Sequence, residues 1–405
     1  MHYTELKLAW LNLNRERRRT LISLSAIVVG VVGYLLASGF IDWIFWALRE
    51  SAIDNGLGHI QISASGFRDS GQADPQGFEI PASAPELEAI RKTPGVVAVA
   101  PRLNVSGLVS LGDVTVPFIA EGVDPAIEPR ISKDLVIDGE PLGTVADGIV
   151  LGRGLARALG ARSRDRLAFI TSGSTGGLNG VEGRLLGVFS TGVKAYDDVA
   201  VRMPLALAQQ LARTKKVHLW VIGLDDTTRT DAVANAIAPI AGAAGLEMRT
   251  WLQLSDFYRK TVTLMSRQML VLAVLIALIL MLGITNLLTM SALERTGEIG
   301  TMLAVGTPRG SVMRIHFAEG VLLGAGGAIV GTIIGIVLAI LISWVGIPMP
   351  PPPGRDSGYQ AEILLSARGI IDATLLALAS AAVAGVYPAW RASRMAIVDA
   401  LRFNR

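Results

Sequence analysis

The residue types that usually carry nucleotide or covalent chemistry are present in this chain, but not at the spacings that such chemistry requires. A phosphate-binding loop needs a Gly-Lys pair before Ser or Thr, because the lysine and the backbone amides hold the phosphates, and the sequence has no Gly-Lys pair. The glycine-rich segment 172–180 also lacks a lysine. The four histidines are scattered, no Gly-x-Ser-x-Gly elbow occurs, and there is no cysteine. We therefore expect no nucleotide hydrolysis, no metal site and no covalent catalysis, so that the chain is not an enzyme.

The most informative segment is 286–319, which leaves one apolar run and enters another. Between the two runs we expect a short amphipathic helix. Its charged side carries Glu294, Arg295 and Glu298, and its apolar side carries Ile299, Met302 and Leu303. Such a helix either lies on the lipid surface or forms a docking surface for a partner outside the bilayer. The break at Gly306 and Pro308 favours docking, because it would fix the helix between two membrane spans.

Four apolar runs are long enough to cross a membrane, which takes about 20 residues. Of the 405 residues, 51% are apolar and 18% are charged, so part of the chain belongs in water. The first run is longer than a typical signal-peptide core and no A-x-A site follows it, which indicates a membrane helix. The predicted fold is an α-helical membrane protein with four transmembrane helices and a large mixed α/β domain inserted between the first and second helices.

Arginines near the membrane runs set the expected orientation. They form three groups that fall on one side of the membrane if all four runs span it, which places both termini in the cytoplasm. These residues are Arg15, Arg17, Arg18, Arg19, Arg295, Arg309, Arg314, Arg391, Arg394, Arg402 and Arg405. The expected segments are a cytoplasmic segment 1–19, membrane helices 20–48, 266–293, 315–347 and 369–391, an external domain 49–265, a cytoplasmic loop 294–314, a short external loop 348–368 and a cytoplasmic tail 392–405.

The external domain is predicted to alternate strands and helices. We expect strands at 60–63, 96–101, 103–111, 115–122, 166–171, 183–189 and 217–223, a strand and then a helix over 148–159, and helices at 84–92, 204–213 and 231–244. Ser83, with Glu86 three residues later, is the expected cap of the helix at 84–92. Segment 172–180 is typical of a hairpin tip.

Helical patterns at 41–53 and 254–268 continue from the membrane runs into the external domain. They predict two helical stalks, and the alternative is ordinary helix ends with an aromatic belt.

The third membrane run carries two further features. Gly327, Gly331 and Gly335 are four residues apart, and such spacing lets helices approach closely, so we expect helix packing there. Glu319 lies at the start of the same run. Intramembrane carboxylates are functional candidates, but this one is about one turn deep, which favours a structural role over proton transport.

Several motifs together resemble the FtsX-like ABC transporter permeases, which include the lipoprotein-releasing and macrolide-exporter permeases. Residues 294–306 with Glu319 and Gly320 are similar to that family's ERxxEIGxxxAxG…EG signature. Residues 9–21 resemble its A-x-x-N-L…R-R-T-L opening, and 387–402 resemble its YPAxxAS…ALR close. The likeness covers both ends and all four membrane runs. One departure lies at 162–166, where a Gly-Asp pair is common in the family.

The resemblance implies a permease subunit of the bacterial inner membrane that works beside a second permease, identical or homologous. Two copies of a separate ABC ATPase would bind ATP and Mg, and this chain would need no cofactor of its own. The segment 294–309 would be a coupling helix on the ATPase, and its motion would reach the periplasmic domain by mechanotransmission. The residues implied at the coupling surface are Glu294, Arg295, Glu298, Ile299, Met302, Gly306 and Arg309.

The implied function is extraction of a lipoprotein or another lipidic substrate from the periplasmic side of the membrane. The substrate cavity between the two permeases would be lined by Phe40, Ile44, Met265 and Met269. A periplasmic lipoprotein carrier would dock on the hairpin at Ser172, Gly176, Leu178 and Asn179, although this tip lacks the expected prolines and aromatics. The alternatives are tripartite efflux of peptides or drugs from the periplasm, and an FtsX-like signal transmitter that activates a periplasmic hydrolase. Membrane lipids are expected partners, and nucleic acid is not.

Overall fold

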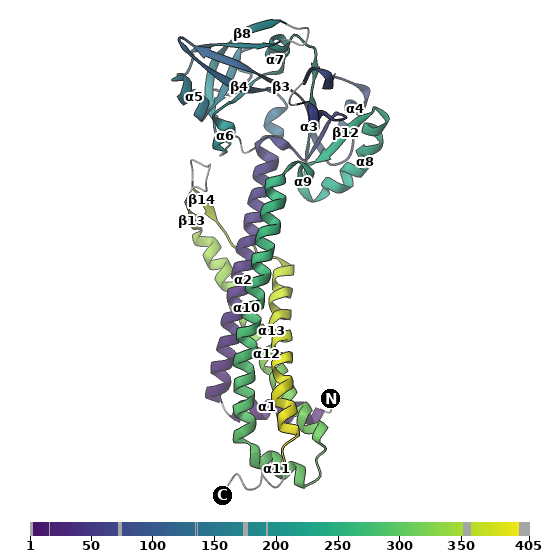
Figure 1. Ribbon diagram of the computed structural model, residues 1–405, viewed down its shortest axis with the longest axis vertical. Coiled ribbons are helices and arrows are strands. Elements are labelled where there is room, and N and C mark those ends of the chain that lie inside the picture. Colours follow the sequence, from purple (N-terminus) through teal and green to yellow (C-terminus); the bar gives the residue numbers. More distant parts are fainter. Residues whose placement is uncertain are drawn as a thin grey trace. The chain divides into compact units, whose positions relative to one another are not determined.

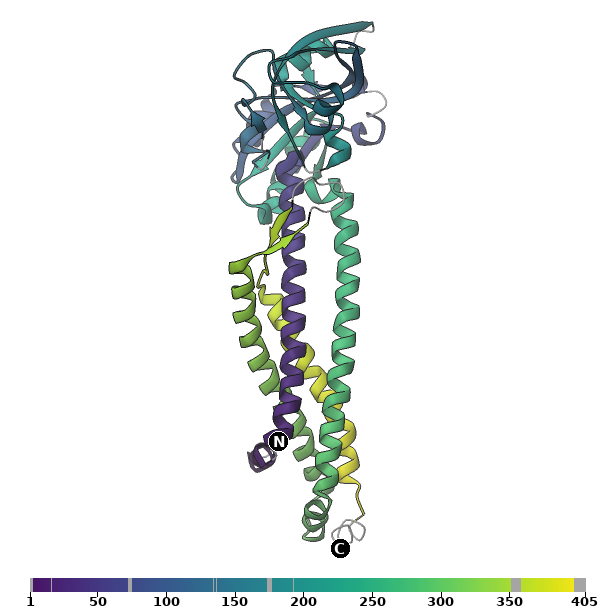
Figure 2. The same cartoon turned by 90° about the vertical axis from the view of Figure 1, so that its left-hand side faces the viewer.

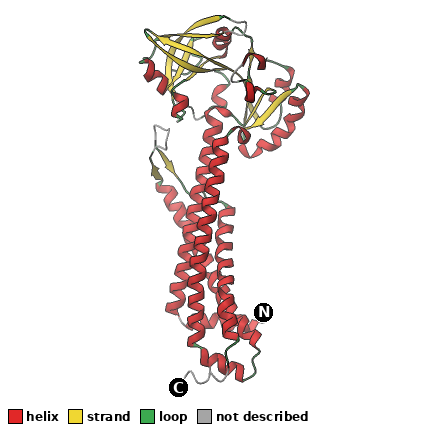
Figure 3. Cartoon of the chain, in the orientation of Figure 1, coloured by secondary structure: helices red, strands yellow, loops and turns green. Residues whose placement is uncertain are grey.

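The computed structural model describes residues 3–396 except 16, 72–74, 134, 136, 173–176, 192 and 351–357. The chain divides into two compact units. The helical unit comprises residues 1–46, 261–348 and 360–405, and the mixed unit comprises 47–260 and 349–359. Figure 3 shows that helices make up the first unit and that most strands belong to the second.

Four helices in the described part of the chain are long and apolar enough to cross a membrane, as predicted. They are α2 (Arg17–Ala52), α10 (Asp256–Glu294), α12 (Arg309–Val345) and α13 (Ala367–Ser393), and two shorter helices, α1 (Tyr3–Arg15) and α11 (Thr296–Ala304), accompany them. Figures 1 and 2 show the long helices side by side. At about 1.5 Å per residue, α2 and α10 are each longer than the roughly 30 Å hydrocarbon core, so both continue as helix beyond it.

The helical unit is held together by small residues that face larger ones. A Cβ added at Gly327, Gly331 or Gly335 would lie 2.5–2.8 Å from the side chains of residues 27, 31 and 35 of α2. That separation is too short for any side chain, so the glycine row lets α12 approach α2 within the same chain. Nearer the start of α12, an added Cβ at Gly324 would lie 2.3 Å from the Ala381 Cβ of α13. The spacing predicted from the sequence thus serves packing inside one chain.

The mixed unit is built on a ten-stranded sheet in the order β12-β1-β11-β3-β4-β9-β6-β8-β5, with β7 paired to both β3 and β8. Its strands are β1 (Ile60–Ala64), β3 (Val96–Leu111), β4 (Val114–Val123), β5 (Ile137–Gly139), β6 (Gly148–Gly152), β7 (Arg166–Ser172), β8 (Leu178–Phe189), β9 (Ala200–Pro204), β11 (Leu219–Leu224) and β12 (Leu246–Thr250). Two small pairs are β2 (Ile80–Pro81) with β10 (Lys216–Val217), and β13 (Ile347–Met349) with β14 (Tyr359–Ala361).

Short helices and helical turns complete the mixed unit. They are η1 (Ile53–Leu57), α3 (Phe67–Ser70), η2 (Pro75–Phe78), α4 (Pro85–Arg91), η3 (Glu128–Arg130), α5 (Arg153–Leu159), α6 (Lys194–Asp197), α7 (Leu205–Ala212), η4 (Thr227–Arg229), α8 (Thr230–Ala243) and α9 (Trp251–Leu254). The expected Ser83 cap is wrong, because α4 begins at Pro85 after Ala84 and no side chain caps it. Proline at the first helical position has a fixed φ and no N–H group to satisfy, so the helix begins without a side-chain cap.

The two strands expected at 96–101 and 103–111 form the single strand β3. Its first part pairs with β11 up to Arg102, and its second part pairs with β4 from Leu103 onward. Proline has no N–H group to donate to a neighbouring strand. Pro101 is tolerated because β3 pairs only with β11 at this point, and its pairing with β4 begins after Pro101. The sheet therefore continues through the point that the sequence suggests as a break.

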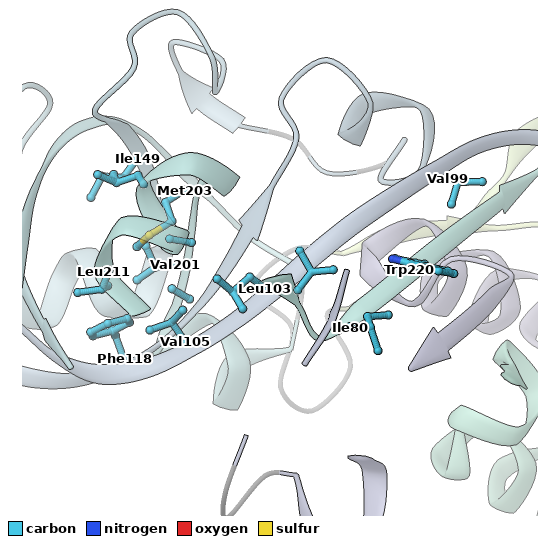
Figure 4. Close-up of a cluster of buried hydrophobic side chains, with 14 of the residues drawn as sticks. Ile80, Val99, Leu103, Val105, Phe118, Ile149, Val201, Met203, Leu211 and Trp220 are labelled. Atoms are coloured by element: carbon cyan, nitrogen blue, oxygen red, sulfur yellow. The ribbon is translucent and has the colours of Figure 1, made fainter. Parts of the chain in front are cut away.

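The core of the mixed unit follows this sheet. Figure 4 shows Val105 and Phe118 near Val201, Met203 and Leu211, and Ile80 beside Trp220 farther along β3. All of these side chains are at least 90% buried and belong to one hydrophobic cluster. The Trp220 indole donates a 2.9 Å hydrogen bond to the Pro81 carbonyl, so the one polar group of that side chain is also satisfied.

Candidate functional site

The helix α11 is separated sharply from the helices on either side of it. α10 ends at Glu294, and Arg295 adopts a non-helical conformation before α11 begins. At the other end, the Gly306 amide donates to the Leu303 carbonyl and the Thr307 amide donates to the Met302 carbonyl. Gly306 has a φ of +99°, a region that side chains disfavour, which explains the glycine at this turn. Pro308 then precedes α12, so α11 is held in a tight loop between two long helices.

One side of α11 is buried against the ends of its neighbours. Ile299 and Leu303 form a cluster with Ala292 of α10, Val312 of α12 and Ala392 of α13. Ile299 therefore packs inside the chain and does not lie on the exposed surface expected for a partner contact. Because the cluster draws on three long helices, a force on α11 acts on all of them.

The opposite side of α11 and the turn that leads into α12 are exposed. The Glu298 side chain is 53% exposed, and Arg309 and Gly306 are also exposed, while Met302 is half-buried. Val305 is 84% exposed, and the sequence interpretation had not singled it out. The Val305 side chain is therefore accessible to a partner at the end of α11.

The two glutamates of the charged side pair with arginines from the start of the chain. Arg19 makes two hydrogen bonds to the Glu294 carboxylate, at 2.5 and 2.8 Å, and Arg15 Nη1 lies 2.8 Å from Glu298 Oε1. Both pairs are solvent-exposed, so neither contributes much to stability. Their effect is to fix the positions of the N-terminal helices relative to α10 and α11.

A buried polar cluster centred on Glu319 lies behind this surface. Asn12 Nδ2 donates a 2.6 Å hydrogen bond to Glu319 Oε1, and Arg295 Nη1 and His316 Nδ1 lie 3.6 and 3.7 Å from the carboxylate. Arg295 Nη2 also donates to the Asn12 carbonyl at 2.8 Å. Arg295 is thus buried and acts inside the chain, contrary to the partner contact expected for it. Asn12, Thr20, Leu288, Ser291, Arg295 and Glu319 line a small cavity at this cluster.

A second link joins α1 to α12. The buried Glu5 carboxylate accepts three hydrogen bonds from Arg314, between 2.8 and 3.1 Å. The sequence interpretation used Arg15, Arg19 and Arg314 only as orientation signals and missed these roles. Together with the Glu319 cluster, the link makes α1, α11 and the start of α12 one connected assembly. No group of three or more His, Asp or Glu among the residues described is arranged to hold a metal ion.

The remaining predicted site residues lie on other elements. Phe40 and Ile44 on α2, and Met265 and Met269 on α10, are half-buried. Leu178, at the start of β8 where β7 and β8 form a hairpin, is 79% exposed. Asn179 is tied down, because its Nδ2 donates to the carbonyls of residues 210 and 211 at 2.8 and 2.9 Å. Ser172 ends β7, and Gly176 lies outside the described residues, as do Arg402, Arg405 and the motif at 399–402.

Comparison with known proteins matches two family models. The model described as MacB-like periplasmic core domain matches residues 20–240, and the one described as FtsX-like permease C-terminal matches residues 270–397. The second match contains α11 together with Arg295, His316 and Glu319, and Asn12 lies outside it.

Curated relatives of two kinds align with 98% of the chain. The lipoprotein-releasing system transmembrane protein LolC of Neisseria meningitidis serogroup B is 24% identical, with 99% of that protein covered. The macrolide export ATP-binding/permease protein MacB of a Shewanella species is 23% identical, and the alignment spans 60% of its length. A crystal structure of the periplasmic region of MacB from Actinobacillus actinomycetemcomitans is similar to 53% of this chain and 95% of that one, at 14% identity and a TM-score of 0.38.

Proposed function

This chain belongs to the family of FtsX-like ABC transporter permeases with a MacB-like periplasmic core domain, and from that premise we propose that it couples ATP hydrolysis by a separate ATPase to extraction of a lipidic substrate. The substrate would be a lipoprotein or another lipid-anchored molecule, taken from the inner membrane at its periplasmic side. Both termini and α11 would lie in the cytoplasm. Two ATPase subunits would bind ATP and Mg, and a second permease, identical or homologous, would complete the transporter.

The observation that carries the proposal is the packing of α11 against the long helices. Its buried side is fixed to α10, α12 and α13, while Glu298 and Val305 on the other side are exposed. A helix that only rested on lipid would not need a buried ion cluster behind it, because the lipid surface exerts no directed force. The Glu319 cluster and the two arginine pairs give α11 the stiffness that a coupling helix requires.

The choice of substrate rests on the relatives. The alignment with LolC, a lipoprotein-releasing transmembrane protein, covers nearly the full length of both proteins. In the proposal, Phe40, Ile44, Met265 and Met269 line a lipid-accessible cavity that forms only between two permeases. The exposed Leu178 at the β7–β8 hairpin would be a contact for a periplasmic carrier.

A second candidate is tripartite efflux of peptides or drugs from the periplasm. It is favoured by the match of residues 20–240 to the MacB-like periplasmic core domain and by the alignment with the macrolide export proteins. Cross-linking of the mixed unit to an outer-membrane channel complex in cells would support efflux, whereas cross-linking to a soluble lipoprotein carrier would support lipoprotein release.

The experiment reconstitutes the full chain with its ATPase in nanodiscs that carry a fluorescent triacylated lipoprotein. We expect ATP-dependent appearance of lipoprotein in the soluble fraction when a carrier is present, and none with a non-hydrolysable nucleotide. Release at the same rate without ATP, or without the permease, would overturn the proposal.

A further inference from the structure

Two fully buried arginines lie at the centre of the mixed unit, where no part of the proposed function has used them. Arg102 on β3 is 2% exposed and Arg202 on β9 is 1% exposed. Both bind the buried Glu128, with Arg102 Nη2 at 2.7 Å and Arg202 Nη1 at 3.0 Å from Oε1. Glu121 lies close to both, at 3.8 Å from Arg102 and 3.4 Å from Arg202. The cluster therefore has two positive and two negative groups.

The same guanidinium groups also bind the turn that follows α2. Arg202 Nη2 donates to the Asn55 carbonyl at 3.3 Å, and Arg102 Nη1 donates to the Gly56 carbonyl. This turn, η1, is a single π-helical turn in which Gly56 has a φ of +141°. The last carbonyls of a helix have no partner within the helix, so the two arginines satisfy groups that would otherwise stay unbonded. The end of α2 is thus attached to the sheet by charge-assisted hydrogen bonds.

The position of the arginines in the sheet makes this attachment central. Arg102 is the last residue of β3 that pairs with β11, and the next residue begins the pairing with β4. Arg202 pairs in register with Glu121 of the neighbouring strand β4. The network therefore joins the part of the sheet that contains β11 to the part that contains β9. A displacement of η1 acts on both parts at once.

The two arginines favour the charged form of Glu121. Burial alone would raise the pKa of Glu121, but Arg202 and Arg102 offset it and hold that pKa below its usual value. Tyr196 reinforces this by a hydrogen bond to the Glu121 carboxylate. Buried ion pairs of this kind are often no more stabilising than apolar side chains of similar size, whereas their directional bonds fix a geometry. A geometric role accounts better for two buried arginines than a stabilising one.

We propose that Arg102 and Arg202 are positioning residues that clamp the turn after α2 to the sheet, so that a displacement of α2 reaches the domain without being absorbed in the turn. The inference rests on the proposed function for the origin of that displacement. The clamp itself is a property of the mixed unit and can be measured without substrate.

The first test uses the full transporter with its ATPase in nanodiscs. The native sequence has no cysteine, so two introduced cysteines can carry the spin labels without competing sites. They are Leu48→Cys near the end of α2, a half-buried position of the mixed unit, and Asp113→Cys in the exposed β3–β4 turn of the same unit. We expect the same narrow distance distribution in the nucleotide-free and the vanadate-trapped states, because the clamp moves α2 and the sheet together. A distance that changes by several ångströms between these states in the otherwise unchanged chain would overturn the proposal.

The second test compares Arg202→Lys with the matched control Arg166→Lys, an exposed arginine on β7. Lysine keeps the charge but lacks the planar fork that reaches both Glu128 and the Asn55 carbonyl. We expect a broadened distribution of distances between the end of α2 and the sheet, and a loss of lipoprotein release. The ATPase rate should stay unchanged, and the control should match the parent.

An unchanged distance distribution in Arg202→Lys would contradict the clamp. If the parent transporter released no lipoprotein at all, the proposed function would fail, and the distance measurements would still decide the clamp. If Arg202→Lys did not fold, Arg102→Lys would replace it, and the distances in the parent chain would remain a test that depends on neither substitution.

Discussion

Asn12 and Glu319 are 307 positions apart in sequence, and the Asn12 amide donates a 2.6 Å hydrogen bond to the Glu319 carboxylate. Glu319 is 3% exposed, and Arg295 lies 3.6 Å from the same carboxylate. This contact fixes α1 to the start of α12 directly behind α11. It gives the buried Glu319 carboxylate a structural task within the helical unit.

Glu319→Ala should destabilise the chain strongly, because it leaves Arg295 buried without its carboxylate. Breaking a buried pair by removing one partner costs about 3–5 kcal/mol. The measurement is the free energy of unfolding of the full chain in a fixed detergent, with the exposed Glu362→Ala as control. Equal losses for the two variants would show that the cluster does not hold the helices together.

Charge reversal at Glu298 distinguishes a role in the internal ion pair with Arg15 from direct contact with the ATPase. Glu298→Lys should lower the ATPase rate of the complex and change stability by less than about 1 kcal/mol, because the pair with Arg15 is exposed. The double variant Arg15→Glu with Glu298→Arg should restore the rate if the internal pair is what matters. Persistent loss in the double variant would instead assign Glu298 to direct contact with the ATPase.

Gly331→Ala should destabilise the helical unit, since the added Cβ would lie 2.8 Å from the Val31 Cβ. Overpacking of a tight contact typically costs about 1–3 kcal/mol. Gly33→Ala is the matched control on α2, because nothing lies within 4 Å of its added Cβ. The comparison is the Tm of each variant in the same detergent, and a Gly331→Ala protein as stable as the Gly33→Ala protein would contradict the packing described.

The mixed unit should lose stability as the pH falls from about 6.5 toward 4. Burial, reinforced by Lys133 and Arg49, lowers the pKa of His59 to about 4. Its Nδ1 accepts a 3.1 Å hydrogen bond from the Leu224 amide, a bond that requires the unprotonated ring nitrogen. Between these two pH values the unfolded chain binds a proton that the folded chain does not, so unfolding becomes easier as acid is added.

The measurement for this prediction is the free energy of unfolding of the full chain between pH 4 and 7, compared with His59→Gln. The variant should show a shallower dependence on pH. Burial also lowers the pKa of His218, so part of the slope should remain. Identical slopes in the parent and the variant would rule out His59 as a source of the acid sensitivity.

The four membrane helices and α11 could be predicted from the sequence because their signals are local. Apolar length marks a span, and the separation of Glu298 from Ile299 and Leu303 marks an amphipathic turn. The continuity of β3 could not be predicted from the sequence. Proline usually interrupts a strand, and only the pairing of β3 with its neighbouring strands shows that Pro101 does not. β9 was missed because Arg202 interrupts its apolar pattern, and that arginine is buried only through partners distant in sequence.

The candidate site was only partly predictable for the same reason. Arg19 and Glu294 are 275 positions apart, and nothing in either local pattern indicates the other. Arg295 and Ile299 were assigned to a partner surface by motif, whereas their burial depends on α1 and the helix ends that surround them. Exposure of Val305 likewise depends on how α11 is seated, which composition does not reveal.

The central claim is that the exposed side of α11 couples a separate ATPase to substrate extraction. It is tested most directly by ATP-driven release of a fluorescent triacylated lipoprotein from nanodiscs that contain the transporter, comparing the parent chain with Val305→Asp. Val305 is 84% exposed and outside the buried cluster, so the variant should fold normally. The account predicts that the variant loses ATPase binding and ATP-dependent release, and release at the parental rate from Val305→Asp would contradict it.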